Sequence, residues 1–353
     1  MANLNDQDLI AEIDKEEMAR IISELPMQIE EGWSQSQKLI LPSYYLKANK
    51  VVILGMGGSG ISGALVKSLL QTENEIPIFV HRDYGIPGFV DEKTLVIAVS
   101  SSGNTGETLD AFMAAYSKGA KLVAICTGGK LESLAKKYKA PVYKFKYQSQ
   151  PRAAMGYSFA ATLGILKKIG IVATEITQKE IDQAISLLKK YNETWKPGIT
   201  VRKNLAKRIA NNIFENIPVI WAGGILEEVT RRWKCQMNEN AKNTAFFEVS
   251  PELNHNTVSD LDFPKPKNLY VVILKSKFYD PRINKRIEVC RDILNKKEVP
   301  HLLVDIDTVG GPLAEMLSYV LLGDYVSFYL AILYDIDPTE IPTIKYLKEK
   351  LKE

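Results

Sequence analysis

The sequence predicts an α/β fold with two doubly wound parallel sheets flanked by helices. Short apolar runs alternate with helical stretches twice along the chain, and a purely helical stretch separates the two series. The first series has its apolar runs at 51–54, 76–80, 95–99, 122–125 and 142–145, and the second at 217–221, 245–249, 269–274 and 302–304. Apolar runs of this length, separated by helices, are typical of parallel strands that are covered on both faces.

This alternation divides the chain into four predicted parts. Helices over 1–45 precede a first sheet domain at 46–150. A helical connector at 151–212 then leads to a second sheet domain at 213–353, which closes with C-terminal helices. The second series repeats the class of the first, which suggests a duplication.

One late stretch is apolar enough to raise the question of a membrane span. It runs from Leu313 to Tyr334 and includes Glu315, Gly323 and Asp324. Charged residues are rare in membrane-spanning helices, so the sequence favours a buried core helix.

Composition narrows the class of partner. The chain has 353 residues, of which 46% are hydrophobic and 25% charged, and a formal net charge of +3. This near balance argues against nucleic acid or an anionic membrane and favours small molecules. Three cysteines without CxxC spacing indicate reduced thiols. The acidic N-terminal stretch lacks the features of an export signal, so we expect a cytoplasmic protein.

Two loops have the character of anion sites. SSSGNTGET, at 100–108, joins an apolar run to a helical pattern, and GMGGSG, at 55–60, does the same earlier in the chain. Free backbone N–H groups, the positive ends of helix dipoles and several hydroxyls suit a phosphate monoester. In the second half, the corresponding segment Trp221 to Gly224 lacks serines, so only the first sheet is expected to bind phosphate.

A dinucleotide-binding dehydrogenase is an alternative, because GMGGSG fits the Gly-x-Gly-x-x-Gly pattern. Such a site needs an acidic residue at the end of the next strand, whereas this strand runs into His81, Arg82 and Asp83. The hydroxyl-rich loop also has no role in a dehydrogenase. These two points favour a sugar phosphate.

At this stage five segments carry a resemblance to a known family. GMGGSG with SSSGNTGET resembles a sugar isomerase (SIS) domain. PRAAMGYSF at 151–159, NENAKN at 238–243 and PELNHN at 251–256 resemble the bifunctional phosphoglucose/phosphomannose isomerases. The resemblance spans most of the chain. It implies two SIS-type sheets and an enzyme that interconverts glucose 6-phosphate, and mannose 6-phosphate, with fructose 6-phosphate through a cis-enediol.

The resemblance also implies residue roles. Glu239 is the base that moves the proton, although from sequence alone it reads as a solvated helix charge outside the apolar stripe of its helix. His255 assists ring opening, with Asn254 and Asn256 expected to orient its ring; its alternative is a surface histidine in a turn. In SIS-type isomerases this histidine comes from the neighbouring subunit, which implies a homodimer.

Two cations complete the implied catalytic set. Arg152 stabilises the enediolate, with a surface salt bridge as the alternative. Lys345 assists ring opening, and a solvated lysine face is its alternative. The phosphate is assigned to Gly58, Ser59, Ser100, Ser102 and Thr105, with the alternative that the serines and threonine near Leu109 only cap the helix.

We expect neither a metal nor a cofactor. The histidines His81, His255 and His301 lie in separate segments without HxH or HExxH spacing, which argues against a zinc-dependent mannose phosphate isomerase of the cupin type. Two other functions stay open. One is a sugar-phosphate-binding regulator, although the acidic N-terminal helices do not suit DNA. The other is the isomerase part of a glutamine-dependent sugar aminotransferase, although no glutaminase sequence precedes the first sheet.

Overall fold

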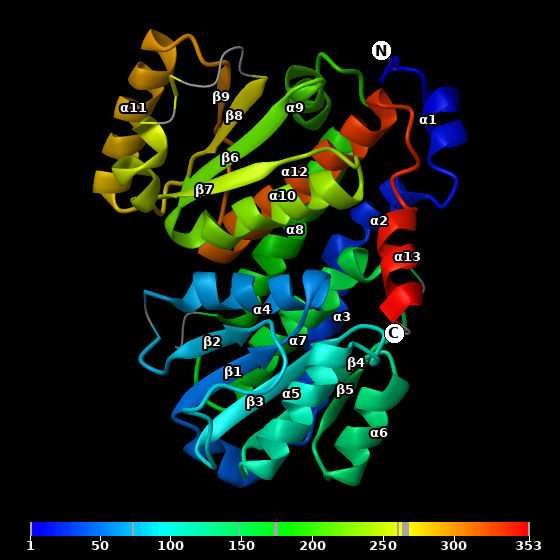
Figure 1. Cartoon of the computed structure of the whole chain (residues 1–353), viewed down its shortest axis with the longest axis vertical. Coiled ribbons are helices and arrows are strands. Elements are labelled where there is room, and N and C mark those ends of the chain that lie inside the picture. Colours follow the sequence, from blue (N-terminus) through cyan, green and yellow to red (C-terminus); the bar gives the residue numbers. More distant parts are fainter. Residues whose placement is uncertain are drawn as a thin grey trace. The chain divides into compact units, whose positions relative to one another are not determined.

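The computed structural model describes residues 2–72, 74–147, 149–172, 176–259, 261–262 and 268–351. The chain forms two compact units, each built around one of the two sheets in Figure 1. The first-sheet unit combines 24–185 with 342–353, and the second-sheet unit combines 1–23 with 186–341. Helix α8 (Gln178–Trp195) runs from one unit into the other. The four-part division drawn from the sequence stays a prediction.

The first sheet is parallel throughout, with the strand order β2-β1-β3-β4-β5. Its strands are β1 (Lys50–Leu54), β2 (Ile78–His81), β3 (Thr94–Ser100), β4 (Lys121–Cys126) and β5 (Val142–Lys144). All five expected strands are therefore confirmed. The second strand begins two residues later than expected, since Pro77 has no N–H to donate to the ladder.

Helices cover both faces of this sheet. Ile53 faces α4 (Gly57–Leu70), because a Cβ on Gly63 of that helix would lie 2.5 Å from its Cγ2. The alternate residues Val52 and Leu54 belong to a core with Phe112 of α5 (Gly106–Ser117) and Leu131 of α6 (Gly129–Lys137). Burial on both faces explains why the strands read as continuous apolar runs.

The second sheet is also parallel, with the order β7-β6-β8-β9. Its strands are β6 (Ile217–Gly223), β7 (Phe246–Ser250), β8 (Leu269–Leu274) and β9 (His301–Val304), which confirms the other four expected strands. The longer helices of this unit are α9 (Leu205–Ile213), α10 (Glu227–Glu239), α11 (Pro281–Lys296) and α12 (Pro312–Leu333).

The remaining elements are mostly short. They are α1 (Gln7–Ile13), α2 (Met18–Ser23), α3 (Leu25–Lys38), η1 (Ser43–Lys47), η2 (Pro151–Ala154), α7 (Met155–Lys168), η3 (Gly224–Leu226), η4 (Glu252–His255), η5 (Thr257–Ser259) and α13 (Pro342–Leu351). The first-sheet unit packs α3 against α7, where Gly32 brings the two backbones into contact: a Cβ there would lie 2.8 Å from the Tyr157 carbonyl oxygen.

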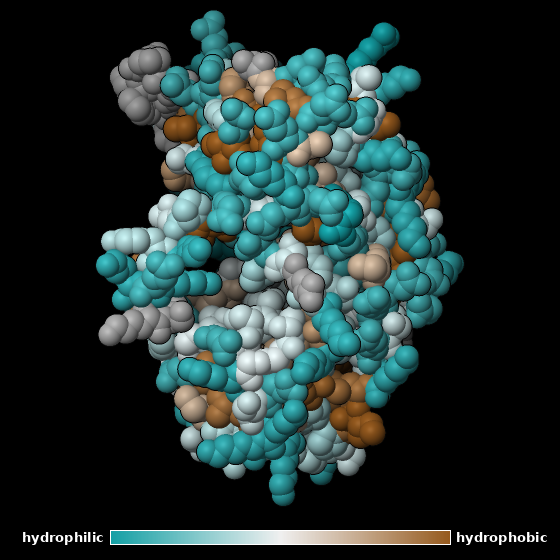
Figure 2. Space-filling view, turned by 90° about the vertical axis from the view of Figure 1, so that its right-hand side faces the viewer, coloured by the Kyte–Doolittle hydropathy of each residue, from teal (hydrophilic) through white to brown (hydrophobic). Residues whose placement is uncertain are grey.

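Helix α12 is the apolar stretch noted in the sequence. It is long and apolar enough to cross a membrane, but the whole of its apolar window is buried inside the protein. Leu313 to Leu333 are all buried, including Glu315 and Asp324. The prediction of a core helix is confirmed. On the face of the molecule shown in Figure 2, hydrophilic residues predominate and hydrophobic ones form small scattered groups.

Candidate functional site

The two predicted anion loops lie side by side at the carboxyl edge of the first sheet. Strands β1 and β3 are neighbours, and their crossovers lead to helices α4 and α5 on opposite faces. This is the switch point of a doubly wound sheet, the usual place for a ligand. Both loops therefore direct a helix N-terminus to one place.

Neither helix N-terminus is capped by a side chain. Met56 and Thr105 occupy the N-cap positions of α4 and α5, and neither makes a side-chain cap hydrogen bond. The Thr105 hydroxyl instead lies 2.9 Å from Ser100 Oγ. The alternative that Thr105 only caps its helix does not match this geometry. In α4, the Ser59 N–H already donates to the Met56 carbonyl at 3.0 Å.

A serine pair joins the two loops. Ser59 Oγ accepts from the Ser101 backbone N–H at 3.3 Å and lies 3.5 Å from Ser101 Oγ. Ser59 and Ser100 are buried, with 6% and 1% of their surface exposed. Ser101 was not among the predicted residues, although it stands in the same serine run. Ser101 could not be predicted because its role depends on the contact with Ser59, which is distant in sequence.

In the later part of the second loop, hydrogen bonds and close packing hold the backbone in one conformation. Ser102 is exposed, and its Oγ accepts from the Asn104 N–H at 3.2 Å. Gly103 has a φ of +67°, and a Cβ there would lie 1.8 Å from the Gly128 carbonyl oxygen. The loop therefore packs against the start of α6, and Ser102 supports this turn.

Two arginines adjoin the first loop. A Cβ on Gly58 would lie 2.8 Å from Arg152 Cα, which places η2 directly on the first turn of α4. Arg152 is only 2% exposed, unlike the members of a surface salt bridge. A Cβ on Gly60 would lie 3.3 Å from Arg82 Nε, so Arg82 is a second cation beside this loop. Nothing in the sequence distinguished Arg82 except its place after the second strand.

The remaining member of the first-sheet unit is Lys345. It lies in α13, a helix in which no described residue is buried, and its side chain is exposed. This exposure agrees with the solvated-face alternative, and its catalytic role stays a prediction.

Glu239 and His255 belong to the second-sheet unit. Glu239 is the last residue of α10 and is half-buried, and His255 is exposed at the end of η4. The expectation that two asparagines orient the His255 ring differs from the observed bonds. Asn254 Nδ2 donates to Cys290 Sγ at 2.9 Å, and Asn256 Nδ2 donates to Glu252 Oε1 at 2.9 Å. These amides fix the turn that carries the histidine.

The second sheet has closed its own switch-point edge. The Gly223 N–H at the end of β6 donates to the Tyr279 hydroxyl at 3.2 Å, and this hydroxyl donates to the Leu274 carbonyl at 3.0 Å. Tyr279 is 5% exposed, and burial raises the pKa of its hydroxyl well above the ordinary value. The Gly223 amide is therefore engaged within the second sheet's own edge, and phosphate binding by the first sheet alone stays a prediction.

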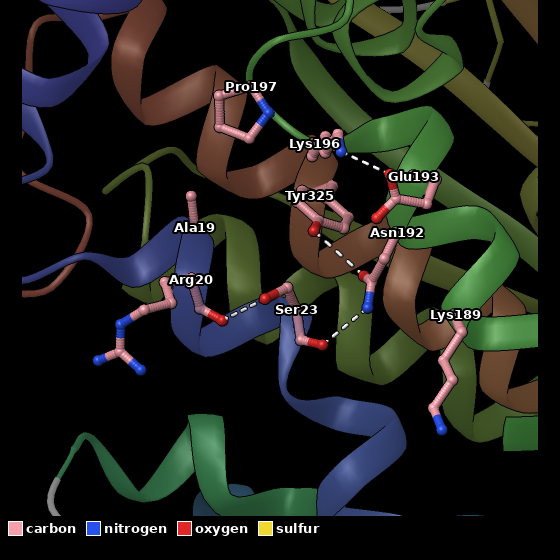
Figure 3. Close-up of a pocket in the computed structure, with 9 residues that line it drawn as sticks. All are labelled: Ala19, Arg20, Ser23, Lys189, Asn192, Glu193, Lys196, Pro197 and Tyr325. Carbon is pink, nitrogen blue, oxygen red and sulfur yellow. Dashed lines mark hydrogen bonds and ion pairs between the residues drawn. The ribbon is translucent and has the colours of Figure 1, made fainter.

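A cavity of about 490 Å³ lies in the second-sheet unit, away from the predicted residues in sequence (Figure 3). It is lined by Ala19, Arg20, Ser23, Lys189, Asn192, Glu193, Lys196, Pro197 and Tyr325. Its polar groups pair with one another: Tyr325 donates to Asn192 Oδ1 at 3.1 Å, and Asn192 donates to the Ser23 carbonyl at 2.7 Å. Among the described residues, no group of three or more His, Cys, Asp or Glu side chains is placed to hold a metal ion.

Comparison with known proteins shows the family. Residues 44–165 match the SIS domain model, and 202–351 match the model of the bacterial phospho-glucose isomerase C-terminal SIS domain. A bifunctional phosphoglucose/phosphomannose isomerase of Caldicellulosiruptor bescii is 39% identical over 95% of this chain and 99% of its own length. The chain belongs to this family. The Aquifex aeolicus member is 34% identical over 86% of this chain and 90% of its own length.

A solved structure supports the fold of the family member. The C-terminal domain of glucosamine-fructose-6-phosphate aminotransferase from Francisella tularensis has a TM-score of 0.68 at 16% identity, covering 92% of this chain and 98% of that domain. The resemblance inferred from the five motifs is confirmed, as is the α/β class with two SIS-type parallel sheets. The chain is an isomerase.

Proposed function

We propose that this isomerase interconverts glucose 6-phosphate, and also mannose 6-phosphate, with fructose 6-phosphate by proton transfer through a cis-enediol, without metal or cofactor. The observation that carries the proposal is the pair of uncapped helix N-termini at the β1/β3 switch point, surrounded by buried hydroxyls. Relatives named for both isomerase activities support the choice of substrates.

The phosphate group is assigned to the first-sheet unit. The hydroxyls of Ser59, Ser100, Ser102 and Thr105 and the backbone at Gly58 bind its oxygens. Two helix dipoles directed at one point favour a dianion, and the hydroxyls donate hydrogen bonds to its oxygens. Arg82, beside the same loop, adds positive charge close to the anion.

The proton transfer is assigned to Glu239. A carboxylate removes the proton from C2 of the aldose and returns it to C1, so that a single base is sufficient. Arg152 stabilises the negative charge that develops on the enediolate oxygen. His255 and Lys345 move the proton between the ring oxygen and the C1 hydroxyl to open the ring. The open chain rotates about its C2–C3 bond, which presents either C2 epimer to the same carboxylate.

The proposal also covers the oligomeric state of the protein and its cellular location. We assign a homodimer in which each site receives its histidine from the neighbouring subunit, and a cytoplasmic location. Three free thiols, two of them buried, suit a reducing compartment.

The test is a coupled assay on EDTA-treated protein that offers each hexose 6-phosphate in turn. The proposal expects isomerisation that is unchanged by EDTA, and a loss of at least about 10³-fold in kcat for Glu239→Gln. Glu248→Gln is the matched control, since Glu248 is also a half-buried glutamate of the second-sheet unit. Loss of activity after EDTA would contradict the metal-independent route. Absence of isomerase activity with every hexose phosphate would favour a sugar-phosphate-binding regulator.

A further inference from the structure

We infer that Ser327 of α12, together with Asn240, positions the catalytic carboxylate of Glu239. This inference rests on the proposed function of Glu239 as the base. It concerns contacts within the second-sheet unit, where the end of α10 that carries Glu239 is fastened to a buried helix.

The first contact between α10 and α12 lies two helical turns before Glu239. Arg232 of α10 and Asp324 of α12 form a bidentate pair, with 3.1 Å between Nε and Oδ1 and 2.8 Å between Nη2 and Oδ2. Their side chains are 3% and 9% exposed. Seven residues make almost two full helical turns, so Arg232 and Glu239 lie on the same face of α10. A planar bidentate pair fixes the rotation of α10 as well as its distance from α12.

The two helices approach closely beside this pair. A Cβ on Gly323 would lie 2.2 Å from Trp233 Nε1, and this indole N–H donates to the Tyr319 carbonyl at 2.8 Å. Both residues of α10, Arg232 and Trp233, are buried. The middle of α10 is therefore held in one register against α12.

The last contact with α12 is made by Asn240, the residue directly after Glu239. Asn240 is 0% exposed, and its Nδ2 donates to Ser327 Oγ at 2.9 Å. The Ser327 hydroxyl in turn donates to the backbone carbonyl of Asp324 at 2.8 Å. Asp324 thus receives Arg232 on its carboxylate and Ser327 on its carbonyl. Asp324 and Ser327 of α12 therefore hold Arg232 within α10 and Asn240 at its C-cap, one before and one after Glu239 along the chain.

The other neighbour of Glu239 is held as well. Asn238 Nδ2 donates to the Asn243 carbonyl at 2.8 Å, which closes the turn after the helix. Glu239 thus stands between two asparagines whose amides are both engaged. A base that must reach two adjacent carbons of one substrate depends on such restraint, since small displacements cost large factors in rate.

The serine is the sharpest point to test, because Ser327→Ala removes one oxygen and leaves the buried ion pair intact. We expect kcat to fall about tenfold while KM for fructose 6-phosphate stays within about twofold. Affinity for a phosphorylated sugar hydroxamate, which mimics the enediolate, should fall by the same factor as kcat. Ser327→Cys keeps a donor and an acceptor at this position and should restore part of kcat.

Ser318→Ala is the matched control. Ser318 is equally buried in α12, but its hydroxyl donates only along its own helix, to the Ala314 carbonyl at 2.7 Å. Ser327→Ala should lose more thermal stability than Ser318→Ala, because it removes the acceptor of the buried Asn240 amide, and only Ser327→Ala should lose kcat. Equal kcat values for the two folded variants, with an active wild-type chain, would overturn this inference alone. A wild-type chain that isomerises no hexose phosphate would overturn the proposed function and this inference with it.

Discussion

Replacing Gly58 with alanine tests how the first turn of α4 and the Arg152 segment are held together. The new Cβ would lie 2.8 Å from Arg152 Cα and 3.0 Å from the Pro151 carbonyl oxygen. Ordinary contact begins at 3.4 Å, so the two backbones must separate by about 0.6 Å. Both contacts are with backbone atoms, which cannot rotate away as a side chain would. We expect the variant to lose about 1–3 kcal/mol of stability, as is usual for overpacking.

The functional cost should exceed the loss of stability alone. A shift of this size moves the α4 N-terminus relative to the Arg152 segment, and we expect kcat/KM to fall about tenfold. Weaker inhibition by inorganic phosphate should accompany the fall. The coupled isomerase assay and thermal unfolding measure the two effects separately.

Gly88→Ala is the control for this substitution. Gly88 lies in the same unit, is exposed, and has no atom within 4 Å of the position that a Cβ would take. It should leave activity and Tm unchanged. If Gly58→Ala matched Gly88→Ala in phosphate inhibition and in kcat/KM, the packing of Gly58 against Arg152 would have no role in phosphate binding.

Two further predictions concern the second-sheet unit and the assembly. Lys207 is 0% exposed and donates to the Leu4 and Pro197 carbonyls, and burial lowers its pKa from 10.5 to about 8. Between pH 8 and pH 10.5 the unfolded chain binds one more proton at Lys207 than the folded chain, so the free energy of unfolding rises with pH. Measured by urea unfolding, this free energy should rise by about 1–2 kcal/mol more in wild type than in Lys207→Met between pH 8 and 9.5. An equal slope in both proteins would refute this. Mixing inactive Glu239→Gln and His255→Ala chains should restore about a quarter of wild-type activity, because half of the dimers then hold one intact site. No recovery in mixed dimers would place both groups on one chain.

The central strands of the first sheet, β1, β3 and β4, were the most predictable because they are buried on both faces. Leu95 to Val99 lies between helices on the two faces of the sheet. Because both faces are covered, consecutive residues are all apolar, and this run is visible in the sequence. Boundaries were less predictable, as at Pro77, where the missing N–H delays the ladder.

The loops were predictable in position, and their contacts were not. Ser100 and Ser59 stood out because hydroxyls and glycines follow apolar strands. By contrast, Ser101 and Arg82 acquire their places only through residues distant in sequence. The same reason hides Tyr279, which closes the second sheet's edge from 56 residues beyond Gly223. Long-range contacts of this kind leave no periodic signal in the sequence.

Glu239 shows the limit most clearly. Its helix has a stripe of buried residues, including Val229, Trp233 and Met237, from which Glu239 is absent. Periodicity therefore describes it as a solvated charge. Only the family motif singled it out, and only the structure shows Asn240, beside it, bonded to α12.

The most direct test of the central claim is a crystal structure of the protein with fructose 6-phosphate. We expect the phosphate between the N-termini of α4 and α5, with its oxygens within hydrogen-bonding distance of the hydroxyls of Ser59, Ser100 and Thr105. A phosphate at the β6 edge beside Gly223, or in the cavity lined by Arg20, would contradict the account.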